Sequence, residues 1–174
     1  MREANFYILV EGRNDARIVE SMIRDMSGYS IIVADGFSSL LSKAATILKT
    51  KSSPLVLFAD TDSVESTEVR SKDLFIKDIL NYRSYESRLQ VILSSPEIEV
   101  TLFSNVEFFK KYFETEISVF EWEQMKQAPK QSLQILIGSR DIYDVILADQ
   151  KWLVELRKSP QRKKIEKFYE KYIS

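Results

Sequence analysis

Short apolar segments alternate with amphipathic stretches over the first hundred residues of the chain. Four continuous apolar runs, rich in β-branched and aromatic residues, are typical of buried strands. They are residues 6–10 (FYILV), 30–34 (SIIVA), 54–59 (PLVLFA) and 89–93 (LQVIL). Because helical patterns lie between the first three runs, the sequence predicts βα units. The predicted fold class is therefore α/β, with a central, mainly parallel sheet of about four strands flanked by helices.

Two predicted helices lie between these strands. Apolar residues recur at helical spacing in residues 15–26, with Asn14 as the predicted N-cap, and again in residues 40–48. Asp35 and Gly36 are predicted to form the turn before the second helix. Residues 63–85 are polar and charged, and we expect them to be partly helical and partly loop.

The second part of the chain is predicted to be a mostly helical extension packed on the α/β core. We divide the chain into a core of residues 1–104 and an extension of residues 105–174, with no Gly/Ser-rich linker that would mark a separable domain. Residues 133–137 (LQILI) could form a further strand. Four aromatic residues are expected to pack the extension onto the sheet: Phe108, Phe109, Tyr112 and Phe113.

The composition narrows the possible chemistry. The 174 residues include no cysteine, which excludes disulfides, thiolate nucleophiles and the usual structural zinc sites, and no histidine, which excludes a Ser-His-Asp triad. The net charge of -1 does not indicate a polyanion-binding chain. No apolar run is long enough to cross a membrane, and residues 1–5 show no signal peptide, so we expect a cytoplasmic protein without membrane partners.

Candidate acidic site residues follow three of the four predicted strands, and Asp35 follows the second strand as well. Glu11 follows the first strand, Asp60 and Asp62 follow the third, and Glu97 and Glu99 come shortly after the fourth. The carboxyl ends of parallel strands meet at one edge of a sheet, so we expect Glu11, Asp60 and Asp62 within a few ångströms of one another. Like charges about 4 Å apart cost roughly 4 kcal/mol at an effective dielectric constant of 20. Such a cluster requires a cation, and an all-carboxylate donor set suits Mg²⁺ or Mn²⁺.

Each acidic motif also has a structural interpretation. Aspartates after strands, such as Asp60 and Asp62, often cap a turn. Gly12 can simply permit a tight turn, and Asp15 favours the start of a helix. Glu99 is equally compatible with a favourable charge in the first turn of a helix.

Basic residues in two places are candidate phosphate contacts. Arg13 follows the first strand, although a surface arginine is its commoner role. The basic segment 151–174 could follow a nucleic-acid backbone, but alternating Lys and Glu also fit the exposed face of an amphipathic helix. The candidate contacts in this segment are Lys163 and Lys164.

Two motifs in the first part of the chain resemble those of the Toprim family, which includes topoisomerases, bacterial primases and OLD-family nucleases. Residues 10–15 (VEGRND) resemble the strand-Glu-Gly-x-x-Asp signature, and residues 58–63 (FADTDS) resemble the strand-Asp-x-Asp signature. Residues 96–103 (PEIEVTLF) are similar to a third stretch found in small stand-alone Toprim-like proteins of the RloB type. Those proteins often have Trp where Thr101 stands. The resemblance covers about residues 4–103.

The resemblance implies a Toprim-like, Rossmannoid core and a division of roles among the acidic residues. Glu11 would act near the reacting phosphate as an acid/base or a metal contact. Asp60 and Asp62 would be the principal Mg²⁺ ligands, and Gly12 and Asp15 would support them.

By the same resemblance, Glu99 would be a further metal ligand, with Glu97 as its competitor. The implied function is a Mg²⁺-dependent nuclease that hydrolyses phosphodiester bonds of DNA or RNA, in defence or repair. The resemblance also implies a separately encoded ATPase as partner. The sequence itself has no Walker A loop, so any ATP dependence would come from such a partner. Two alternatives stay open: a non-catalytic module that binds nucleic acid or protein, and a nucleotidyl transferase.

Overall fold

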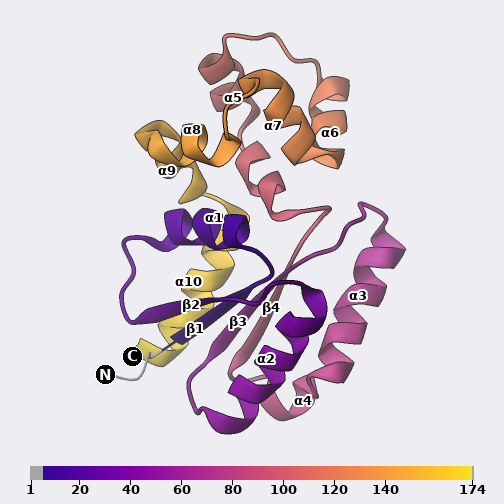
Figure 1. The fold of residues 1–174 in the computed structure, drawn as a ribbon, viewed down its shortest axis with the longest axis vertical. Helices are drawn as coiled ribbons and strands as arrows, with labels where there is room; N and C mark the ends of the chain where they lie inside the picture. Colours follow the sequence, from indigo (N-terminus) through magenta and orange to yellow (C-terminus); the bar gives the residue numbers. More distant parts are fainter. Residues whose placement is uncertain (1–5, 174) are drawn as a thin grey trace.

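The computed structural model describes residues 6–173, so the N-terminal residues 1–5, in which we predict no signal peptide, lie outside the described residues. Four parallel strands form one sheet in the order β2-β1-β3-β4 (Figure 1). They are β1 (Phe6–Val10), β2 (Tyr29–Val33), β3 (Leu55–Asp60) and β4 (Leu89–Ser94). The four predicted strands are confirmed to within one residue at each end. The predicted α/β class is confirmed too, as a parallel four-stranded sheet flanked by helices.

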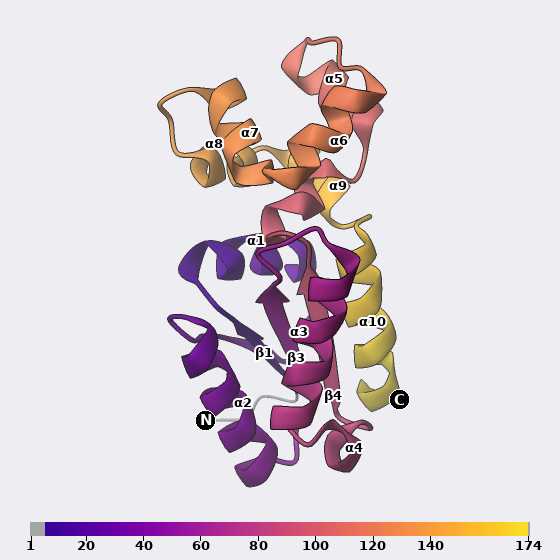
Figure 2. The same ribbon diagram turned by 90° about the vertical axis from the view of Figure 1, so that its right-hand side faces the viewer.

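Helices cover both faces of the sheet. Side chains of a strand alternate between its two faces, and β1 accordingly contributes Ile8 to one buried cluster and Leu9 to the other. The Leu9 face is covered by α2 (Phe37–Thr50) and α3 (Ser66–Ile79), and the Ile8 face by α1 (Arg13–Ile23) and α10 (Pro160–Ile173) (Figure 2). A short helix, α4 (Tyr82–Tyr85), leads into β4.

The first helix begins earlier than the sequence predicts. Gly12, and not Asn14, is the N-cap of α1, and its N–H donates a hydrogen bond to Asp15 Oδ2 at 2.8 Å. The predicted cap at Asn14 is therefore wrong, because the carboxylate of Asp15 already serves the start of the helix. The predicted turn before α2 is confirmed, with φ of 63° at Asp35 and 107° at Gly36.

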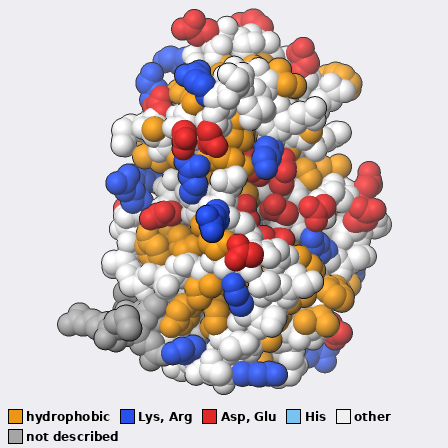
Figure 3. Space-filling model, in the orientation of Figure 1, with side chains coloured by type: hydrophobic (Ala, Val, Ile, Leu, Met, Phe, Trp, Pro, Cys, Tyr) orange, Lys and Arg blue, Asp and Glu red, His pale blue; other side chains and the backbone are white. Residues whose placement is uncertain are grey.

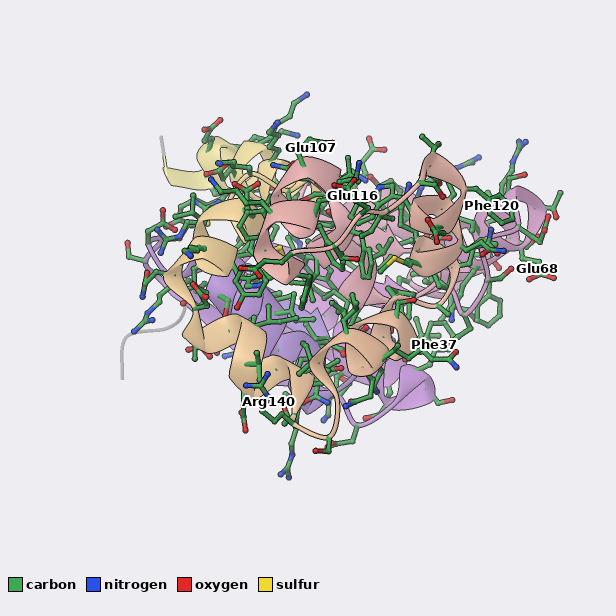
Figure 4. The ribbon with its side chains drawn as sticks, turned by 90° about the horizontal axis from the view of Figure 1, so that it is seen from above. Phe37, Glu68, Glu107, Glu116, Phe120 and Arg140 are labelled. Carbon is green, nitrogen blue, oxygen red and sulfur yellow. The ribbon has the colours of Figure 1, made fainter. Side chains whose placement is uncertain are left out.

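Between β4 and α10 the chain forms a helical part above the strand ends (Figure 1). In Figure 4, which looks down on this part, Glu107 and Arg140 lie at opposite edges. Its elements are η1 (Ile98–Phe103), α5 (Val106–Phe113), α6 (Val119–Gln127), α7 (Pro129–Ile137), α8 (Ile142–Ala148) and α9 (Gln150–Leu156).

Residues 133–137 are helical, so the possible fifth strand is wrong. Pro129 occupies the first turn of α7, where a missing N–H costs nothing, and thereby favours a helix start. Leu133 and Ile137, four residues apart, are buried on one side of that helix. The apolar run is thus one face of an amphipathic helix.

The aromatic residues of α5 pack mainly within the helical part. The ring of Phe109 lies 5.0 Å from the rings of both Phe103 and Trp122 and 6.0 Å from that of Trp152. Phe108 also contacts Trp152, at 4.8 Å. The expectation that these aromatic residues pack directly onto the sheet is corrected accordingly: their ring partners belong to η1, α6 and α9.

The last helix returns to the sheet. Phe168 of α10 packs against Phe6 of β1, with ring centroids 6.2 Å apart. The buried Arg162 donates hydrogen bonds to the carbonyl of Met22 and, at 2.7 Å, to Asp25 Oδ1. Residues 160–173 are therefore part of the α/β layer. No helix in residues 6–173 is long and apolar enough to cross a membrane.

Candidate functional site

Asp60 occupies the centre of the acidic edge of the sheet. It is the last residue of β3, a strand that lies between β1 and β4, and it pairs in register with Ser94. Its backbone N–H donates a hydrogen bond to Glu11 Oε1 at 3.1 Å. The ends of β1 and β3 therefore meet, as predicted, and the Glu11 carboxylate lies directly beside Asp60.

The electrostatic environment of Asp60 is strongly negative. Burial, followed by repulsion from four carboxylates, raises the pKa of Asp60 from its ordinary value of 3.8 to about 8. The four carboxylates belong to Asp15, Glu99, Glu11 and Glu97. Figure 3 shows acidic side chains gathered across the middle of one face, at the level where the sheet meets the helical part. A cation at this edge would relieve the repulsion.

Glu11 shares this environment. Burial, more than any other cause, raises the pKa of Glu11, and the charges of Asp15 and Asp62 act in the same direction. The hydrogen bond from Asp60 and the positive charge of Lys72 oppose the shift. Glu11 is thus a half-buried carboxyl group that holds its proton more tightly than an exposed glutamate.

Asp62 is turned to solvent and paired with a lysine. Its backbone is in the left-handed region, with φ of 58°, and its N–H donates to the carbonyl of Pro96 at 2.9 Å. The Asp62 side chain is 82% exposed and forms an ion pair with Lys72 Nζ at 3.0 Å. The structure therefore brings Glu11 and Asp60 together and leaves Asp62 at the solvent side of the edge.

The acidic edge suits a divalent cation held by few protein ligands. Among residues 6–173, no group of three or more acidic side chains is placed to hold a metal ion. Mg²⁺, however, is commonly held by one or two carboxylates and completes its shell with waters and substrate oxygens. Asp60 and Glu11 supply such a pair of oxygen donors, and the negative charge around them favours a cation.

Gly12 and Asp15 are accounted for by the start of α1. Gly12 has φ of -128°, which other residues also adopt, and a Cβ there would meet the Asp15 carboxylate at an ordinary 3.6 Å. Asp15 accepts the Gly12 N–H and caps the helix. Its charge also contributes to the raised pKa of Asp60. Asp15 therefore supports the site by position and by charge.

Glu99 is held in the interior by a residue that the sequence does not reveal. It is only 3% exposed, and the hydroxyl of Tyr143 in α8 donates a hydrogen bond to its Oε1. Burial raises the pKa of Glu99 and outweighs that hydrogen bond, which lowers it. Arg17 of α1 lies 5.6 Å from the Tyr143 ring and pairs with Asp144. Glu99 is thus fixed near Asp60 by contacts from the helical part.

Glu97 has a structural role at another helix. Its Oε1 accepts the N–H of Lys130 in the first turn of α7 at 2.9 Å. The N-cap of α7 is Ala128, whose side chain has no acceptor, so Glu97 supplies the missing cap from a distant segment. Capping of α7 therefore accounts for the position of Glu97 without any metal-binding role.

The candidate phosphate contacts lie in different places. Arg13 is exposed in the first turn of α1, two residues from Glu11. Lys163 and Lys164 are exposed on α10, whose neighbouring Arg162 contacts Met22 near the far end of α1. The 11 residues of α1 span about 16 Å at 1.5 Å per residue. Arg13 therefore adjoins the acidic edge, whereas the two lysines are remote from it.

Lys72 of α3 is a second residue that the sequence analysis misses. Its ammonium group pairs with Asp62 and lies 4.4 Å from the centre of the Phe37 ring. It also lowers the pKa of Glu11 by its charge. Neither Lys72 nor Tyr143 belongs to a recognisable motif, and only the folded arrangement brings them to the strand ends.

Comparison with known proteins gives a likeness to one solved region. No family model and no curated protein matches the chain. The C-terminal region of the Xanthomonas campestris pv. campestris OLD protein, in a structure phased with iodine, is similar at 14% identity and a TM-score of 0.47, over 91% of this chain and 96% of that one. The same region phased with mercury is similar at 13% identity and a TM-score of 0.46, over 91% and 97%. Such a distant likeness defines neither substrate nor chemistry.

Proposed function

We propose that this chain is a divalent-metal-dependent nuclease whose metal site is centred on Asp60. The observation that carries the proposal is the position of Asp60, half-buried at the end of the central strand and surrounded by the charges of Glu11, Asp15, Glu97 and Glu99. So many carboxylates around a buried aspartate are unfavourable unless a cation or a proton neutralises them.

Asp60 and Glu11 are the proposed ligands of Mg²⁺ or Mn²⁺. Bound there, the ion would acidify a water molecule and neutralise charge on a phosphate group. Burial raises the pKa of Glu11 in the metal-free protein, so that a cation binding there would compete with a proton. Tyr143 holds Glu99 so that its negative charge faces Asp60. Asp62 would join the site only after leaving Lys72.

Nucleic acid is the proposed substrate, and this part of the proposal is supported by the resemblance of residues 10–15 and 58–63 to Toprim signatures. Arg13 and Lys72 are proposed to contact phosphate oxygens, because both lie at the acidic edge. A role in defence or repair and a separately encoded ATPase as partner are proposed on the same resemblance. A cytoplasmic location stays a prediction from the sequence.

A cleavage assay tests the proposal. Labelled single-stranded DNA, double-stranded DNA and RNA are incubated with the protein in Mg²⁺, Mn²⁺ or chelator. We expect metal-dependent cleavage of at least one polymer, reduced about 100-fold or more by Asp60→Asn. Asp78 is an exposed aspartate of α3. Asp78→Asn is therefore the matched control and should cleave normally. Absence of cleavage of every polymer, or equal cleavage by Asp60→Asn, would remove the proposal.

A non-catalytic interaction module is the second candidate. It is favoured by the internal partners of three carboxylates: Asp62 pairs with Lys72, Glu97 caps α7, and Glu99 accepts from Tyr143. A module of this kind should show no Mg²⁺-dependent rise in melting temperature. A rise that disappears in Asp60→Asn would favour the nuclease instead.

A further inference from the structure

Lys72 is a positive charge held beside the acidic strand ends. It lies in the second turn of α3, and its side chain is only 19% exposed. Its Nζ is 3.0 Å from Asp62 Oδ2, and the Phe37 ring, 4.4 Å away, supports it from α2. Ring and carboxylate together fix the ammonium group in one place, as an ammonium placed over an aromatic ring is attracted to its face.

The ion pair joins the exposed Asp62 carboxylate to Lys72. Asp62 is only two residues beyond Asp60, yet its side chain is 82% exposed and faces Lys72. The charge of Lys72 also reaches Glu11, on the neighbouring strand. Lys72 therefore compensates part of the negative charge that would otherwise attract a divalent cation.

We propose that Lys72 is a built-in competitor of the divalent cation: it holds Asp62 away from Asp60 and Glu11, and its release allows Asp62 to complete the metal site. This inference rests on the proposed function and concerns the regulation of that same site. A polyanionic substrate, whose phosphates attract the lysine, would provide such a release, so that metal and substrate would bind cooperatively.

Lys77, on the same helix, is a matched control. It too pairs with an aspartate, Asp73, at 2.6 Å, and lies 5.4 Å from the centre of an aromatic ring, that of Tyr82. Its carboxylate partner, however, is on α3 itself and not at a strand end. Removing Lys77 therefore removes a comparable ion pair without freeing a ligand for the proposed site.

Direct Mn²⁺ binding, followed by electron paramagnetic resonance of the free ion, tests the inference without any cleavage assay. The variants are Lys72→Met, Asp62→Asn, the double variant, Lys77→Met and Asp60→Asn, each checked for native circular dichroism. Lys72→Gln replaces Lys72→Met if the latter does not fold. We expect Lys72→Met to bind Mn²⁺ about two- to fivefold more tightly than the natural chain, the range of one exposed ion pair. Lys77→Met should bind Mn²⁺ with the same affinity as the natural chain.

The Asp62→Asn background separates two mechanisms. If Lys72 acts by holding Asp62, Lys72→Met should give no gain in affinity when Asp62 is already Asn. An equal gain in both backgrounds would mean that Lys72 acts through its charge alone, and would overturn the inference. Unchanged or weaker Mn²⁺ binding by Lys72→Met would overturn it as well.

Failure of the proposed function gives a different result. If Asp60→Asn binds Mn²⁺ as the natural chain does, or if no protein binds it, the metal site at Asp60 is wrong and the inference falls with it. If binding depends on Asp60 but Lys72→Met brings no gain, only the role of Lys72 is wrong.

Discussion

The hydroxyl of Tyr143 in α8 donates a hydrogen bond to the carboxylate of Glu99 in η1. Both residues are buried, at 4% and 3% exposure, so neither has ready access to water as an alternative partner. The contact joins the helical part to the segment that follows β4. It therefore positions an acidic side chain at the strand ends from outside the sheet.

Loss of this hydrogen bond should destabilise the protein. We expect Tyr143→Phe to lower the free energy of unfolding by about 1–3 kcal/mol, because a buried carboxyl group loses its donor. Urea denaturation at neutral pH measures the change. Tyr112→Phe is the control, since Tyr112 donates to Asp149 at 2.9 Å in a less buried place and should cost less. Equal losses in the two variants would contradict a special role for the Tyr143 contact.

Glu97 should matter for folding through its contact with α7. Replacing it with alanine removes the acceptor of the Lys130 N–H and should cost about 1 kcal/mol, the usual value of a helix cap. Glu107, whose side chain is 80% exposed, lies in the first turn of α5. The free energy of unfolding of Glu107→Ala should stay within about 0.5 kcal/mol of that of the natural chain. Chemical denaturation compares them. A Glu97→Ala protein as stable as the natural chain would show that the capping contact is unimportant.

The stability of the metal-free protein should depend on pH through Asp60. Its pKa is 3.8 in the unfolded state and about 8 in the folded protein, so between these values only the folded state keeps the proton. The stabilisation is complete below pH 3.8 and is lost as the pH rises through about 8. Asp60→Asn should therefore gain stability relative to the natural chain between pH 5 and 8, by about 1–3 kcal/mol. The free energy of unfolding of both proteins is measured against pH in chelator. The same pH dependence in both would argue against a proton on Asp60.

Arg162 should be essential for docking α10. It is buried and contacts Met22, Asp25 and Glu166. Arg162→Met should cost about 1–3 kcal/mol, because the Met22 carbonyl loses its donor and two partly exposed carboxylates lose their partner. Lys163→Met, at the adjacent exposed position, should have almost no effect on the melting temperature. If both variants melt alike, α10 is not held by this arginine.

The sheet could be predicted because its strands are short, continuous apolar runs, and because their order along the chain alternates with helical patterns. The strand predicted at residues 133–137 is wrong for the same reason, because a short apolar run fits a buried strand and one face of a helix equally well. The N-cap predicted at Asn14 is wrong because the helix begins at Gly12, where the carboxylate of Asp15 caps it.

The candidate site could be predicted only in part. The adjacency of Glu11 and Asp60 follows from parallel strands that end at one edge of the sheet. The orientation of Asp62 does not, because Asp62 pairs with Lys72, ten residues away on another element. Likewise, Glu99 depends on Tyr143, 44 residues further along the chain. Contacts between distant segments have no local signature in the sequence.

Proton release on metal binding shows whether a cation binds at Asp60. Because the pKa of Asp60 is about 8, a divalent ion that binds its carboxylate at pH 7 must displace about one proton. Isothermal titration calorimetry with Mg²⁺ in two buffers of different ionisation enthalpy counts these protons. The account predicts a release of about one proton per ion at pH 7, little at about pH 9, and none from Asp60→Asn. Binding heats that do not depend on the buffer, or a release that Asp60→Asn leaves unchanged, would contradict it.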